Sequence, residues 1–177
     1  MAVLKMRTYG DPVLRKRAED VSELNDEILR YIIDLEDTLG KQNGVGLAAP
    51  QVGISKRIFV IDLRPSKEDK RIALINPEII DRSSNVIERE EGCLSVPEVW
   101  GSVIRPESIK IKGMLPNGRI VTIRAEGLYA RALQHEFDHL EGVLFIDYLS
   151  TGELDKNRDL IDQIIDKNRK KLERIQI

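Results

Sequence analysis

The spacing of hydrophobic residues predicts three helices along the chain. The first begins near residues 22–25 and stops at Gly40, the second spans residues 127–141, and the third spans residues 153–174. In the first and third, apolar residues recur every three or four positions, which is typical of helices that cover a core with one face. These residues are Ile28, Ile32, Leu35 and Leu39 in the first helix, and Ile161, Ile164, Ile165 and Leu172 in the last.

Short runs rich in β-branched residues lie between the first two helices and predict strands. The Asn-Gly pair at residues 117–118 predicts a hairpin between the last two of them. The segment 42–53 is broken by three glycines and Pro50, so we expect a shaped loop or an irregular edge there. The expected strands are residues 57–63, 71–76, 86–90, 109–113 and 120–124.

This order of elements predicts one domain over residues 1–177. Strands flanked by helices, without regular strand–helix–strand alternation, favour an α+β fold over a doubly wound one. We expect mixed or antiparallel sheets around the helix at residues 127–141, with further helices toward both ends.

Composition narrows the class of protein. The 177 residues are 41% hydrophobic and 33% charged with a net charge of −2, which is typical of ordinary globular chains and gives no sign of a DNA-binding protein. No apolar run approaches the roughly 20 residues that cross a bilayer, and residues 1–13 do not resemble a secretory signal. The single cysteine, Cys93, has no partner for an internal disulfide. We expect a cytoplasmic protein without a membrane segment.

The only two histidines of the chain, His135 and His139, stand four residues apart on the predicted central helix. This spacing places both imidazoles on one helical face, where they can bind one metal ion. Glu136 lies beside them and can accept a proton from water activated by that metal, which is typical of metal-dependent hydrolases. The alternative is a structural helix with two packed histidines.

A third ligand must come from elsewhere in the chain. Phe145 stands where the metzincin pattern places a third histidine, which argues against that class. A thermolysin-like site needs a glutamate from a later helix; of the two on the predicted C-terminal helix, Glu153 is too close and Glu173 lies in a solvated-looking stretch. A thiolate at Cys93 can complete a three-ligand site with one open position. A lone cysteine is also often a small buried hydrophobic residue, and the pattern alone leaves both readings open.

Three segments together resemble bacterial peptide deformylases. They are GVGLAAPQ (residues 44–51), EGCLS (residues 91–95) and QHEFDHL (residues 134–140), in that family's order and spacing. The resemblance extends over about residues 4–149. It implies an enzyme that releases formate from the N-terminal formylmethionine of newly made polypeptides.

The same resemblance implies the residues that carry the chemistry. Cys93, His135 and His139 would bind one divalent metal ion, with Fe(II) the expected native ion and Zn(II) or Ni(II) able to replace it. Glu136 would accept a proton from water and pass it to the leaving amine. The side-chain amide of Gln51 and the backbone N–H of Leu94 would hold the oxyanion. For Gln51 the alternative is an amide that only caps the loop.

Substrate contacts are expected along the cleft. The backbone at Val45 and Gly46 can pair with an extended peptide as an added strand, although glycines often mark only a turn. An apolar pocket for methionine is expected from Leu128, Ala132 and the aliphatic stem of Arg131, with Trp100 along its wall. These four residues can instead be ordinary core. Glu91 is expected to hold the loop or to orient a ligand.

The predicted C-terminal helix carries a basic cluster. Such a run is usually a solvated face, and contact with ribosomal RNA is the functional alternative. A monomer is favoured. Two rival functions remain: a metallopeptidase that cuts internal bonds, and a metal-stabilised binding domain without catalysis. The cluster comprises Lys167, Arg169, Lys170, Lys171 and Arg174.

Overall fold

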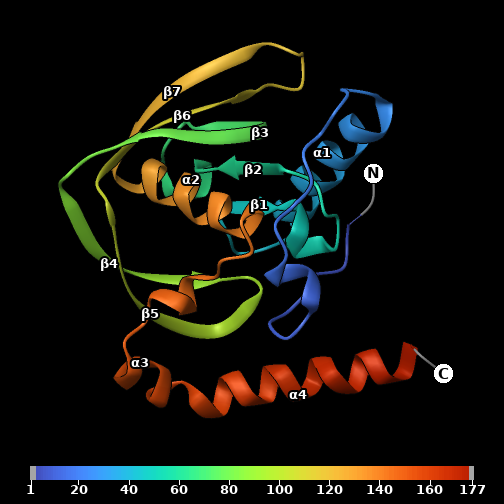
Figure 1. The fold of residues 1–177 in the computed structure, drawn as a ribbon, viewed down its shortest axis with the longest axis vertical. Helices are drawn as coiled ribbons and strands as arrows, with labels where there is room; N and C mark the ends of the chain where they lie inside the picture. Colours follow the sequence, from blue (N-terminus) through green and yellow to red (C-terminus); the bar gives the residue numbers. More distant parts are fainter. Residues whose placement is uncertain (1–2, 176–177) are drawn as a thin grey trace.

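Two antiparallel β-sheets lie on either side of the helix Gly127–Leu140 (α2) in the computed structural model, which describes residues 3–175 (Figure 1). One sheet has five strands in the order β1-β2-β3-β6-β7, and the other pairs β4 with β5. The α+β prediction is confirmed, with every pairing of these strands antiparallel. The strands are β1 Gly46–Ala48, β2 Ile58–Asp62, β3 Arg71–Arg82, β4 Val86–Cys93, β5 Val96–Pro106, β6 Ser108–Met114 and β7 Ile120–Glu126.

The first predicted helix is confirmed as α1, Asp26–Leu39. The Asn25 side chain caps it by accepting a hydrogen bond from the Ile28 N–H at 3.0 Å. Acidic residues occupy its first turn, where their negative charge interacts favourably with the positive end of the helix dipole. Its four predicted apolar residues are buried against the apolar side chains of β1 and β2. The periodic stripe therefore forms one layer of the core.

Strand β3 is longer than predicted, since it continues past residue 76 to Arg82. The Asn76-Pro77 pair reads as a turn in the sequence. The structure instead places a register shift between Ile75 and Glu78, where Asn76 adopts a positive φ of 48°. The Asn76 side chain bonds both the N–H and the C=O of Val21 at 2.8 Å. These tertiary hydrogen bonds hold a bulge at the position where the local sequence suggests that the strand ends.

Strand β5 was not predicted from the sequence. Its prolines and Gly101 disfavour a strand. Pairing with β4 over eight positions nevertheless holds it extended, and Val96, Val99 and Val103 are buried on it. The hairpin predicted at residues 117–118 is confirmed between β6 and β7.

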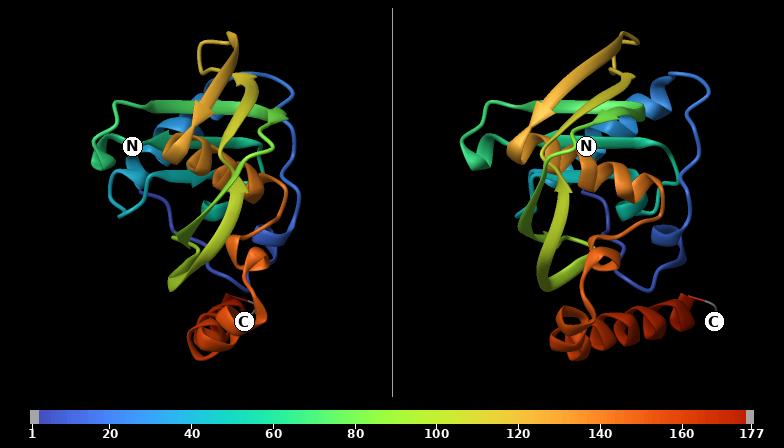
Figure 2. Two further views of the ribbon diagram at one scale, coloured as in Figure 1. Left: turned by 90° about the vertical axis from the view of Figure 1, so that its left-hand side faces the viewer. Right: turned by 60° about the vertical axis from the view of Figure 1, so that its left-hand side comes forward.

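The predicted C-terminal helix is two helices, so the single span 153–174 was wrong. A short helix α3, Thr151–Lys156, ends at Asn157, and α4 follows as Arg158–Ile175. The Asn157 side chain donates to the Trp100 carbonyl at 3.3 Å, which ties the break to β5. Ile161 and Ile164 pack as predicted, against the apolar cluster of β5, and α4 runs along that end of the molecule (Figure 2). The side chains of Leu172, Lys171 and Arg174 lie outside the described residues.

The central helix prediction is confirmed as α2, which starts directly after β7. Ala130, Leu133 and Leu140 are buried among apolar residues of the five-stranded sheet. His135 of this helix lines a cavity together with residues of β1 and β4. Within residues 3–175, no helix is both long and apolar enough to cross a membrane.

Candidate active site

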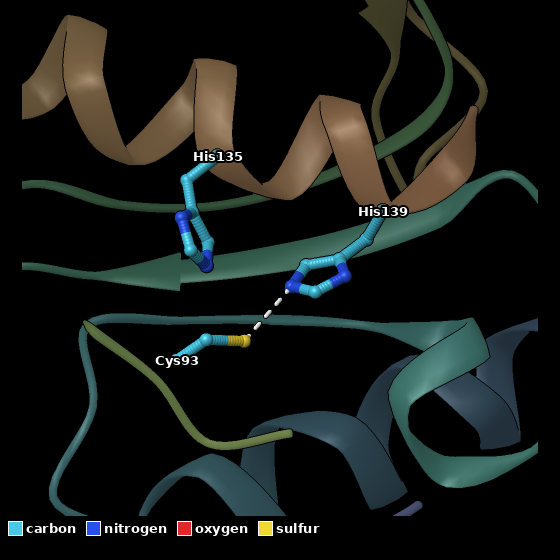
Figure 3. Close-up of side chains that lie close together, drawn as sticks. All are labelled: Cys93, His135 and His139. Atoms are coloured by element: carbon cyan, nitrogen blue, oxygen red, sulfur yellow. Dashed lines mark hydrogen bonds between the residues drawn. The ribbon is translucent and has the colours of Figure 1, made fainter. Parts of the chain in front are cut away.

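The two histidines of α2 and Cys93 meet at one point of the fold (Figure 3). One potential ligand atom from each of the three residues lies within 4.8 Å of the others. The His135 and His139 ring centroids are 5.0 Å apart, and the Cys93 Sγ lies 3.2 Å from the His139 Nε2. Cys93 reaches this position because β4 ends there and the chain turns into β5. The structure thus brings together the three ligands expected from the sequence.

This donor set fits a divalent metal ion. One thiolate and two imidazoles suit Zn(II), Fe(II) or Ni(II), and three protein ligands leave a position open for water or substrate. The His135 Nδ1 lies 3.1 Å from the Glu91 Oε2, so Nε2 is the nitrogen left for a metal. Glu153, the thermolysin-like candidate, instead bonds Ser150 and the Ser102 N–H.

Glu91 is the centre of a buried charge network. Its carboxylate accepts hydrogen bonds from Arg105 at 2.6 and 2.9 Å and from Arg131 at 2.6 Å. Burial raises the pKa of Glu91, but the bonds from His135 and Arg105 outweigh it and lower the pKa to about 2. Arg105 also donates to Asp138 at 2.8 Å. Glu91 is therefore ionised and fixes the His135 ring, as a carboxylate does behind many metal-binding histidines.

Glu136 is 3% exposed and its Oε2 has no hydrogen-bond partner among the described residues. Burial raises the pKa of Glu136 to about 7 in the metal-free protein. The carboxylate lies against β1, since a Cβ on Gly46 would stand 2.8 Å from both Cγ and Cδ of Glu136. A buried carboxylate beside the three candidate ligands, with one oxygen that makes no hydrogen bond, is suited to proton transfer.

The side-chain amide of Gln51 contacts the loop with its oxygen and the site with its nitrogen. Its Oε1 accepts from the Ala48 N–H at 2.8 Å, which is the capping role weighed from the sequence. Its Nε2 lies 3.4 Å from the Cys93 Sγ and donates to the Ser95 Oγ at 3.3 Å. The donor end therefore points at the three candidate ligands. Leu94 follows Cys93 in the turn beside them.

A cavity of about 630 Å³ opens beside the three ligands and is lined by parts of β1, β4, β5 and α2. Arg131 contributes its stem, since its guanidinium is held by Glu91 and by two backbone carbonyls. His139 is not among the lining residues. The sequence-predicted residues that line the cavity are Val45, Gly46, Gln51, Glu91, Cys93, Leu94, Trp100, Leu128, Arg131, Ala132, His135 and Glu136.

Three polar residues at the cavity were missed by the sequence analysis: Gln42, Asn43 and Glu90. Gln42 and Asn43 precede the glycine-rich segment, and Glu90 precedes the buried Glu91. Only their closeness to the motifs could have pointed to them. The pairing of Arg105 with Asp138, which completes the network around Glu91, carried no local signal, because the two residues lie 33 residues apart in the chain.

Comparison with known proteins gives the family. The profile of the family "Polypeptide deformylase" matches residues 3–155. The chain belongs to this family. It is 52% identical to the peptide deformylase of Halothermothrix orenii over 147 residues, which are 83% of this chain and 94% of that protein. It is 49% identical to that of Endomicrobium trichonymphae over 170 residues, covering 96% and 98% of the two chains.

Solved structures of the family share the fold. The crystal structure of a peptide deformylase from Legionella pneumophila matches with a TM-score of 0.85 and 39% identity, covering 99% of this chain and 98% of that one. The enzyme from Thermotoga maritima matches with a TM-score of 0.80 and 44% identity, covering 85% and 99%. This deformylase is a metal-dependent hydrolase that removes the formyl group from N-terminal formylmethionine. The two rival functions are set aside on this ground.

Proposed function

We propose that deformylation takes place in the cavity beside Cys93, His135 and His139, with these three residues holding one divalent metal ion. Fe(II) is the proposed native ion, with Zn(II) or Ni(II) able to replace it, in keeping with the donor set. When bound, such an ion acidifies water and polarises a carbonyl oxygen. The observation that carries the proposal is the buried carboxylate of Glu136, whose Oε2 has no hydrogen-bond partner among the described residues and which lines the same cavity as Cys93 and His135.

Glu136 is the proposed proton carrier. It takes a proton from the attacking water, and the new C–O bond forms at the formyl carbon. It then delivers that proton to the amine nitrogen as the C–N bond breaks, so that formate and a free methionine amine leave. Its burial supports this role, because a carboxylate shielded from bulk water can accept a proton and return it within the site.

Gln51 and Leu94 are the proposed oxyanion donors. The Gln51 Nε2 faces the cluster, and its Oε1 is locked by the Ala48 N–H, so the donor is preorganised. The backbone N–H of Leu94 is the second proposed donor, in the turn next to Cys93. Donors fixed before the reaction need no reorganisation as charge develops.

The extended substrate is proposed to pair with β1. This strand lies at the edge of the five-stranded sheet and pairs only with β2 in it, and Val45 and Gly46 line the cavity. An edge strand offers free backbone groups to an added strand. The methionine side chain then enters the apolar part of the cavity, with Leu128, Ala132 and the Arg131 stem around it.

Further proposals concern the context of the enzyme. Residues 1–177 form one catalytic domain, a view supported by the packing of α4 on the cluster that contains β5. Its partners are nascent formylated polypeptides in the cytoplasm, and the protein acts as a monomer. Contact of α4 with ribosomal RNA is supported only by its basic residues, and ribosome binding that weakens steeply with salt is the result to expect.

The direct test is formate release from a formyl-Met-Ala-Ser peptide by anaerobically prepared protein of known metal content. Release that scales with metal content supports the proposal. Release from protein in which both histidines are replaced would overturn the ligand assignment. The unformylated peptide is the control, since it should not be cleaved.

A further inference from the structure

The chain contains two Asn-Gly pairs, at residues 43–44 and 117–118. Glycine has no Cβ, so its backbone nitrogen is open to approach by the side chain of the asparagine before it. That nitrogen can attack the carbon of the side-chain amide. Whether it does so depends on how the fold holds each pair, and the structure holds the two pairs differently.

The pair at Asn117 is fixed in a tight hairpin. The Asn117 Oδ1 accepts a hydrogen bond from the Arg119 N–H at 3.1 Å, and the Gly118 N–H donates to the Leu115 carbonyl at 2.9 Å. Gly118 also adopts a positive φ of 81°. The side-chain amide and the glycine nitrogen, which are the two groups that would react, are therefore both engaged in hydrogen bonds of the turn.

The pair at Asn43 lacks these restraints. Asn43 is exposed and lies between α1 and β1, in a segment without helix or strand. Within residues 3–175, no group forms a hydrogen bond with the Asn43 side chain or with the Gly44 N–H. The side chain is open to water, and the Gly44 nitrogen gives up no hydrogen bond within the protein when it reacts.

The same segment borders the proposed site. Asn43, Gly44 and Val45 all line the cavity. A Cβ on Gly44 would lie 3.1 Å from the Leu94 Cδ1, so the Gly44 backbone packs closely on Leu94. Extra chain length at residue 43 therefore displaces backbone beside the proposed peptide-binding strand and beside the residue that supplies one proposed oxyanion donor.

We propose that Asn43 is a site of spontaneous deamidation, and that the isoaspartate form of the enzyme is inactive. The Gly44 nitrogen loses its proton and attacks the Asn43 side-chain carbon. The new C–N bond closes a succinimide ring, and the side-chain nitrogen leaves as ammonia. Water then opens the ring at either carbonyl, which gives aspartate or isoaspartate. Aspartate adds a negative charge, whereas isoaspartate also adds a methylene carbon to the backbone.

The test ages the metal-loaded enzyme and compares the two pairs within one chain by trypsin digestion and mass spectrometry. Cleavage after lysine and arginine places Asn43 on the peptide 42–56 and Asn117 on the peptide 113–119. The first peptide should gain about one mass unit, located at residue 43 by fragmentation. The gain should be faster at higher pH, because the reacting nitrogen must lose its proton. Peptide 113–119 should stay unchanged over the same interval.

Activity is measured on the same samples with the formyl-Met-Ala-Ser peptide, at constant metal content. When half of the chains carry isoaspartate, kcat/KM per chain should fall about twofold, since the other half still turns over. Protein isoaspartyl methyltransferase with S-adenosylmethionine converts isoaspartate to aspartate. This treatment should return the activity of the aged enzyme to that of an Asn43→Asp variant, which has the charge without the longer backbone.

The matched control is Asn43→Gln, which keeps an amide but closes the corresponding larger ring poorly. Aged in the same way, it should keep its own starting activity. Deamidation at Asn117 as fast as at Asn43, or none at Asn43, would overturn the proposal, and so would full activity in enzyme rich in isoaspartate at residue 43.

The inactivation rests on the proposed placement of the substrate beside residues 43–46, whereas the mass change does not. Fresh enzyme that releases no formate would count against the proposed site and leave the mass change at Asn43 as predicted. The two failures are therefore distinguishable.

Discussion

The Nδ1 atom of His135 lies 3.1 Å from the Oε2 atom of Glu91, a carboxylate that also receives hydrogen bonds from two buried arginines. Glu91 therefore connects the position of a metal ligand to the packing of β5 and α2. The arrangement fixes which nitrogen of His135 is turned toward the ligand cluster.

Replacing this carboxylate should weaken metal binding. In Glu91→Gln the charge that balances Arg105 and Arg131 is lost and the His135 ring is held less firmly. We expect a roughly 10- to 100-fold loss of metal affinity, measured by titration of the metal-free protein with Zn(II) or Co(II). Thermal stability should also fall, because two buried guanidinium groups lose their partner. The control is Glu88→Gln, at an exposed carboxylate of β4 outside the cavity lining, and equal affinity in the two variants would contradict this role.

Gly46 should not tolerate a side chain. In Gly46→Ala the added methyl group meets the Glu136 carboxylate, which must shift from its place beside the cluster. Turnover should fall sharply, and the free energy of unfolding should decrease by about 1–3 kcal/mol from overpacking. Gly152→Ala is the matched control, since a Cβ there meets nothing within 4 Å. Full activity in Gly46→Ala would show that Glu136 does not need its observed position.

Substitution of Gln51 should lower turnover more than it weakens substrate affinity. Gln51→Ala removes one oxyanion donor, for which losses of about 10²–10³ in kcat are typical. Gln51→Glu provides a sharper version, because it keeps an acceptor for the Ala48 N–H but loses the donor. Steady-state kinetics on the formylated peptide separate kcat from KM. A normal kcat in both variants would leave Gln51 as a loop cap only.

A partly exposed ion pair outside the cavity lining gives a prediction about acid stability. Asp147 accepts hydrogen bonds from Arg15 at 2.5 and 2.8 Å and from the Leu144 N–H. Burial raises the pKa of Asp147, but the Arg15 bond and these contacts outweigh it and lower the pKa below its ordinary value. The stabilisation is therefore present above the ordinary aspartate pKa and is lost as pH falls through the lowered one.

Asp147→Asn should accordingly reduce the unfolding temperature at neutral pH, by an amount that corresponds to about 0.2–1 kcal/mol for a partly exposed pair. The difference from the unmodified protein should shrink as the pH is lowered below about 4. Thermal unfolding of both proteins over a pH series measures this difference. A difference that stays constant down to acidic pH would contradict the assignment.

The elements with strong periodicity were predictable from the sequence, and those held by distant partners were not. The stripe of α1, the histidine spacing on α2 and the Asn-Gly hairpin follow from local spacing. In contrast, β5 contains residues that disfavour strands and depends on its pairing with β4. The continuation of β3 past Asn76 depends on Val21, 55 residues away. Local sequence contains no information on such partners.

The candidate site shows the same division. The spacing of His135 and His139 on a helix was enough to predict a metal site, and the resemblance supplied Cys93. The links of Glu91 to Arg105 and Arg131 join three separate elements, so no motif could reveal them. The cross-strand pairing of Gly92 with Trp100 at the cavity depends on the register of β4 and β5, which only the structure gives.

The central claim is that Glu136 moves the proton for deformylation beside the Cys93, His135 and His139 cluster. The most direct measurement is the rate of formate release by Glu136→Gln, prepared anaerobically and matched to the unmodified enzyme in metal content. Glutamine has almost the same shape but does not accept the proton, so we predict a loss of about 10²–10⁴-fold with metal still bound. Formate release at the unmodified rate would contradict the account.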